Sequence, residues 1–222
     1  MTMSPVDDQQ RRSARVAGII YLASFATVIV VNFGLLAPLL SGDPSHIARN
    51  ILEENTRFRV GLVGQLLYGI GVLVVTAALY IVLRPVNGLL AVLAALGRVV
   101  HGFSWLMVSI NLLLALRLLT QPAYAQALPP DQLAALARFY LSGIDQYYVG
   151  LLFWALGSTV AAYLWLESGY IPRPLSLMGI AASGWAVVCC VAFFVFPEFP
   201  KLVNLWLFDI PMVLFEIAVS LR

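Results

Sequence analysis

The chain has 222 residues, of which 61% are hydrophobic and 11% are charged, and its formal net charge is +2. Soluble domains are about half apolar and about a quarter charged, so a globular interior of this size cannot bury the apolar excess and lipid must cover it. The small, dispersed charge forms no basic patch of the kind that nucleic acid needs. Composition therefore predicts a membrane protein in contact with lipids and excludes nucleic acid as a partner.

The polar segment 1–15 ends in three arginines and precedes an apolar run long enough to cross about 30 Å of hydrocarbon. The run is longer than the core of a signal peptide and has no small-residue cleavage site, so we expect a retained first helix. The sequence predicts an all-α fold, with one six-helix transmembrane domain over residues 16–222. Its spans are 16–40, 60–83, 89–116, 148–166, 175–196 and 202–221.

Two connections have helical patterns but are too polar to cross a membrane. In the first, Asp43 suits a helix cap, Pro44 suits the first helical position, and Ile47 and Ile51 share one face. In the third, a helix starting at Asp131 has apolar residues at steps of three and four, namely Leu133, Leu136, Tyr140 and Ile144. We therefore predict amphipathic interfacial helices in the first and third loops.

Orientation follows from the arginines at the start of the chain. Six spans place both ends on one side of the membrane, and the basic residues outside the spans, the first three arginines included, number six on each side. Because the first span usually dominates and Arg11, Arg12 and Arg15 precede it, we predict that both ends are cytoplasmic. The two amphipathic connections then lie on the outer side.

Two basic side chains lie deep inside the third predicted span. At about 1.5 Å per residue, Arg98 is about 13 Å and His101 about 18 Å from its start, on the same helical face. An unpaired arginine at such depth costs roughly 2.5 kcal/mol or more, so Arg98 needs a partner within the protein. The sixth span provides Glu216 and Asp209, about 8 Å and 18 Å from its inner end. We predict a polar seam in which Arg98 lies near Glu216 and His101 near Asp209.

The seam has two interpretations. In the first, the seam serves only to fix helix register, since polar pairs between transmembrane helices contribute about 0.6 kcal/mol on average yet specify partners. Alternatively, it forms a proton or anion path or a buried ligand site, because ionisable groups within membranes are functional candidates. Asn32, Gln65 and Asn111 are candidates to extend the seam, or else form hydrogen bonds between helices.

No known catalytic or metal-binding motif is evident. The chain has no P-loop, HExxH, GxSxG or Cys/His metal spacing. Its single lysine, Lys201, is at a helix end, which argues against a retinal Schiff base. We therefore expect no catalytic residues, no metal and no cofactor, although a bound lipid or other apolar ligand suits such a chain.

Several segments together resemble the bacterial DUF4386 membrane family. They are ARVAGIIYL, GDPSHIARNILEENTRFRVGLV, LYIVLRPVNGLLAVLAALGRVV, SGYIPRPLSLMGI and IPMVLFEIAVSL, which together extend over about residues 14–222. The resemblance implies a six-helix bacterial membrane protein and matches Arg98 and Glu216 to typical charged positions of the family. It implies no activity. Members often have a histidine near the start of the fourth span, whereas GIDQYYVG here has none.

The leading functional hypothesis is a non-catalytic protein of the bacterial inner membrane, an accessory or scaffold subunit of a membrane assembly. The outer amphipathic segments and the abundant small residues suit packing against other membrane subunits. The alternative is a small transporter or proton-coupled permease that uses Arg98, His101, Asp209 and Glu216. A second alternative is a protein that binds a lipid-like ligand, or a membrane enzyme.

Overall fold

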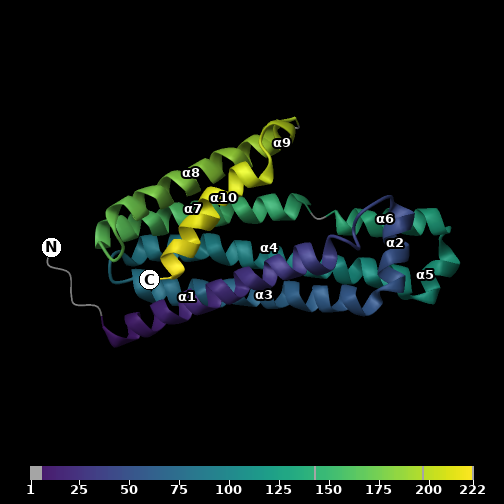
Figure 1. Cartoon of the computed structure of the whole chain (residues 1–222), viewed down its shortest axis with the longest axis horizontal. Coiled ribbons are helices and arrows are strands. Elements are labelled where there is room, and N and C mark those ends of the chain that lie inside the picture. Colours follow the sequence, from purple (N-terminus) through teal and green to yellow (C-terminus); the bar gives the residue numbers. More distant parts are fainter. Residues whose placement is uncertain (1–6, 143, 197, 222) are drawn as a thin grey trace. The chain divides into compact units, whose positions relative to one another are not determined.

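A computed structural model describes residues 7–142, 144–196 and 198–221 (Figure 1). No strand occurs within these ranges, which agrees with the predicted all-α class. The helices, in chain order, are α1 (Asp8–Ile29), the π-helix η1 (Val30–Leu36), α2 (Pro44–Glu53), α3 (Asn55–Leu83), α4 (Gly88–Thr120), α5 (Pro122–Ala127), α6 (Pro130–Leu141), α7 (Ile144–Ser168), α8 (Arg173–Val195), α9 (Phe199–Leu202) and α10 (Leu205–Ser220).

Within the residues that the structure describes, five stretches of helix are long and apolar enough to cross a membrane, and they correspond in order to the first five predicted spans. They are Asp8–Leu36, Asn55–Leu83, Gly88–Thr120, Tyr148–Ser168 and Arg173–Val195. The last predicted span differs. The Asn204 side chain accepts a hydrogen bond from the Leu207 amide at 3.0 Å, so α10 begins only at Leu205. With 16 residues it is about 24 Å long at the standard rise per residue.

The chain divides into two compact units that share its long helices. The first unit comprises Met1–Ala23, Ile70–Phe103 and Tyr148–Arg222, and the second comprises Ser24–Gly69 and Ser104–Tyr147. Helices α1, α3 and α4 each contribute residues to both units.

In the second unit, the end of the first predicted span is a π-helix rather than a continued α-helix. The Ala37 amide donates to the Asn32 carbonyl, five residues back, at 2.8 Å. The wider turn brings residues five apart toward one face, and Val31 and Leu36 are both buried there. Leu36 packs over Gly61 of α3, where the missing side chain leaves room for it.

Helix α2 forms with the predicted cap. The Asp43 carboxylate accepts a hydrogen bond from the His46 amide at 2.9 Å, and Pro44 occupies the first position. This amide holds the pKa of Asp43 below its ordinary value of 3.8. The cap is therefore intact above that value and is lost as pH falls through the lowered pKa. Ile47 and Ile51 share the buried face, as predicted.

The two helices predicted in the first and third loops, α2 and α6, are both present. The two helices pack against each other, so protein rather than lipid covers the apolar face of α2 (Figure 1). Helix α6 uses Ala134 and Ala137 for this contact, because small side chains allow close approach. Leu136, which belongs to the predicted apolar face of this helix, is 39% exposed. The side chain of Ile144 lies outside the described part of the chain.

In the first unit, glycines bring helices α4 and α7 into backbone contact. A Cβ atom at Gly97 would lie 2.5 Å from the Phe153 carbonyl oxygen and 3.1 Å from the Gly157 Cα. At Gly157, a Cβ atom would lie 2.6 Å from the Ala94 carbonyl oxygen. Neither backbone can move without shifting a whole helix, so both positions require glycine.

Gly97→Ala should therefore lower the free energy of unfolding by about 1–3 kcal/mol, the usual cost of overpacking. Thermal unfolding in a mild detergent measures the effect. Gly184→Ala is the matched control, because a Cβ atom there meets nothing within 4 Å. That variant should be as stable as the native chain or slightly more so. Equal stability of both variants would contradict the close contact of α4 and α7.

Candidate functional site

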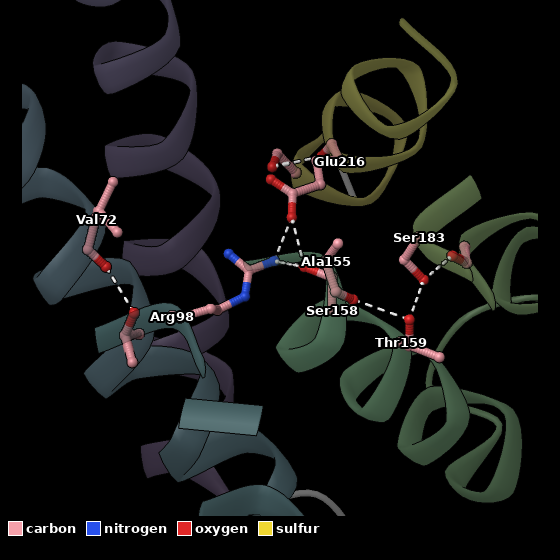
Figure 2. A network of polar contacts seen from close by, with 10 residues as sticks. Val72, Arg98, Ala155, Ser158, Thr159, Ser183 and Glu216 are labelled. Atoms are coloured by element: carbon pink, nitrogen blue, oxygen red, sulfur yellow. Dashed lines mark hydrogen bonds and ion pairs between the residues drawn. The ribbon is translucent and has the colours of Figure 1, made fainter. Parts of the chain in front are cut away.

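An ion pair between Arg98 and Glu216 lies inside the first unit. Arg98 belongs to α4 and Glu216 to α10, and their exposed fractions are only 5% and 4%. The Arg98 Nη2 atom donates to Glu216 Oε1, as Figure 2 shows. The matching of depths along the two helices thus identified two residues that the structure brings together.

Ser158 of α7 joins this pair, and sequence reasoning missed it. Arg98 Nη2 donates to Ser158 Oγ at 3.0 Å, and that hydroxyl lies 3.4 Å from Glu216 Oε1 (Figure 2). Ser158 is 1% exposed. The available signal was its place beside Gly157, where α4 comes closest. The three side chains connect α4, α7 and α10.

The hydrogen-bonding capacity of the pair is only partly used. Among the described residues, Arg98 Nε and Glu216 Oε2 are buried and have no hydrogen-bond partner. A buried polar atom without a partner costs about 1–3 kcal/mol, and more when it belongs to a charged group. The Nε–H group of Arg98 and the Oε2 atom of Glu216 are therefore available to a further polar group or a water molecule.

His101 contacts α7. Its ring stacks on Trp154 with centroids 5.7 Å apart, and the backbone of Gly150 hydrogen-bonds to it. Asp209 is half-buried on α10, and its carboxylate makes no ion pair or hydrogen bond within the described ranges. The described contacts of His101 are thus with α7, and its pairing with Asp209 stays a prediction.

The three residues proposed to extend the seam lie in the second unit. Gln65 Nε2 of α3 donates to Asn32 Oδ1 of η1 at 2.5 Å, so these two form a separate polar contact between helices. Asn111 is half-buried on the part of α4 that belongs to the same unit. This outcome fits the alternative interpretation, that these amides form hydrogen bonds between helices.

A chain of hydroxyl groups connects α7 to α8. Thr159 Oγ1 lies 2.8 Å from Ser183 Oγ and also donates to the Ala155 carbonyl at 2.8 Å. Ser183 in turn bonds to the Gly179 carbonyl at 2.6 Å (Figure 2). These bonds are satisfied locally, so they fix packing and leave Arg98 and Glu216 as the chemically distinctive groups of the first unit.

One buried polar contact near the start of the chain was not expected. Gln10, 5% exposed, donates from Nε2 to the Val82 carbonyl at 3.1 Å and to the Tyr170 hydroxyl at 3.2 Å. Its backbone and side chain also exchange hydrogen bonds with Asp7, which caps α1. Gln10 belongs to the polar segment 1–15 and lies next to two arginines, so local sequence gives no signal of its burial.

A family model described as a domain of unknown function, DUF4386, matches residues 16–221. The chain belongs to the DUF4386 family. No curated protein and no solved structure matches it. Family membership and the long apolar helices together identify this DUF4386 chain as a membrane protein.

The ion pair should contribute to stability mainly through the cost of breaking it. Glu216→Leu leaves Arg98 buried without a counter-charge, and we expect a loss of about 3–5 kcal/mol. The double variant Arg98→Met with Glu216→Leu removes both charges and should recover most of this loss. Thermal unfolding of both variants in one detergent measures the difference. A double variant no more stable than the single one would show that charge pairing is not the stabilising factor.

Proposed function

We propose that this DUF4386 chain crosses the bacterial cytoplasmic membrane six times, with both ends in the cytoplasm. The arginines ahead of the apolar part of α1 support the orientation. Helix α10 supplies the sixth crossing, and local thinning of the bilayer compensates for its short length. In this arrangement the turns at 84–87 and 169–172 are cytoplasmic, and α2, α5 and α6 lie on the outer side.

Within this topology, we propose a non-catalytic role as an accessory or scaffold subunit. The observation that carries this proposal is an apolar ridge on α6. Leu136 and Phe139 are 39% and 72% exposed, on a helix that already buries Ala134 and Ala137 against α2. The ridge lies beyond the proposed spans, so lipid tails do not cover it. Adjacent exposed apolar residues outside the hydrocarbon are typical of contact surfaces.

A second membrane subunit is the occupant proposed for this ridge. Native mass spectrometry of the protein, taken gently from its own membrane, should show a stoichiometric partner. Phe139→Ser should abolish that association by removing most of the exposed apolar side chain. The exposed neighbour Ala135 offers a matched control, and Ala135→Ser should keep the partner. Recovery of the native protein alone, without any stoichiometric subunit, would contradict the accessory role.

A second candidate function is a small proton-coupled permease. It is favoured by the buried Arg98–Glu216 pair, whose Nε and Oε2 atoms have no partner in the described chain. A carboxylate that can take up a proton releases its arginine partner, which then presents a free positive charge. Asp209, half-buried on the same helix, supplies a second carboxylate that protons can occupy.

This candidate predicts proton flux that depends on Glu216. In proteoliposomes loaded with a pH-sensitive dye, an imposed pH gradient should dissipate faster with the native protein than with protein-free vesicles. Glu216→Gln should abolish the difference, because glutamine cannot take up a proton. Glu167→Gln is the matched control, since Glu167 is hydrogen-bonded only to Tyr163 at the exposed end of α7. Undiminished flux in Glu216→Gln would remove the ion pair from the mechanism.

A further inference from the structure

A narrow cleft between α3 and α4 leads to Arg98. Its cavity has a volume of about 10 Å³, close to the space that one water molecule requires. Thr76 and Leu83 mark its ends on α3, whereas Ala91, Ala94, Ala95 and Arg98 line it on α4. The α4 residues fall at intervals of three and four, so they form one continuous face.

The positions of the lining residues give the cleft a direction. Leu83 is the last residue of α3, and Ala91 lies in the first turn of α4. Both are next to the turn that joins these helices. Thr76 and Arg98 lie seven residues further along their helices, which corresponds to about 10 Å. The residues that line this one-water cavity therefore follow both helices from beside the α3–α4 turn to Arg98, and Ala161 of α7 completes its wall.

One turn beyond Arg98 the packing closes. A Cβ atom at Gly102 of α4 would lie 2.9 Å from a methyl carbon of Leu73, so α3 and α4 are in close contact there. On the side toward α7, His101 and Trp154 are stacked and are 4% and 8% exposed. These contacts separate Arg98 from the part of α4 that lies further from the turn.

Polar atoms suited to holding water are gathered at the inner end. Arg98 Nε is a buried donor without a partner among the residues described. The Thr76 hydroxyl donates to the Val72 carbonyl at 2.7 Å, so its oxygen keeps the capacity to accept. Tyr80 also lines the cavity. A buried water typically makes about three hydrogen bonds to groups that otherwise lack partners, and these residues can provide them.

We propose that the cleft holds water and makes the Arg98–Glu216 pair accessible to protons from one side of the membrane only, the side of the α3–α4 turn. Water at this position supplies the partner that Arg98 Nε lacks, and exchange with the aqueous side carries protons to the pair. A functional role for this one-sided access rests on the permease proposed above. The access itself can be measured without an assay of proton flux.

Thiol labelling tests this access. The native cysteines, Cys189 and Cys190, are fully buried and are replaced by alanine. Ala95→Cys places a thiol in the cleft, and Leu93→Cys places one on the neighbouring face, where Leu93 is 48% exposed toward lipid. Because the thiolate is the reactive form and needs water, a charged, membrane-impermeant methanethiosulfonate should modify Cys at position 95 about tenfold faster or more. The variant Asn87→Cys, in the turn between α3 and α4, reports on which side of the membrane this turn lies.

Right-side-out and inside-out vesicles give the direction. The Ala95→Cys variant should be labelled only in the orientation that also labels Asn87→Cys. Labelling no faster than that of Leu93→Cys would show a dry cleft, and labelling from the opposite side would show the wrong direction; either result overturns the proposal. If Ala95→Cys does not give a monodisperse protein, Ala91→Cys replaces it. One-sided labelling combined with unaltered flux in Glu216→Gln would support the cleft while refuting the permease.

Discussion

A charge in hydrocarbon needs its counter-charge within the protein, and the Arg98–Glu216 contact meets this requirement across the first unit. The arginine is on α4 and the acid is on α10, so the ion pair joins two different helices. The requirement therefore selects which helices are neighbours. Ser158 adds α7 to the same contact, so that three helices share one polar contact.

The close approach of α4 and α7 makes that contact geometrically possible. Gly97 lies one residue before Arg98, and Gly157 lies one residue before Ser158. The two glycines remove the side chains that would otherwise hold the backbones apart, and the polar residues that follow them are thereby brought within hydrogen-bonding distance. Backbone proximity and charge pairing thus depend on each other, which ties the packing of the first unit to its electrostatics.

Hydropathy predicted the helices well because each apolar run partitions into lipid largely by itself. The predicted span ends also gave the depth of Arg98 and Glu216 in the membrane, because that depth depends only on position along a helix. Hydropathy does not predict which helices become neighbours. The contact of α2 with α6 and the stacking of His101 on Trp154 both depend on which surface another helix presents.

The same reasoning explains two local differences. The π-helix at Val30–Leu36 follows from packing over Gly61 and Gly64 of a helix that comes later in the chain, and no local propensity announces it. The burial of Gln10 depends on Val82 and Tyr170, 72 and 160 residues away. Ser158 had a local signal in its position beside a glycine, but its partner could be named only once α4 and α7 were known to meet.

The separation of Arg98 and Glu216 along the chain has a consequence for biosynthesis. The two residues are 118 positions apart, and ribosomes add about 5–20 residues per second. Arg98 is therefore made roughly 6–24 s before its acid. During that interval α4 must remain beside the insertion machinery, or keep its arginine near the interface, until α10 arrives. A helix made much later thus completes the neutralisation of the charge that α4 introduces.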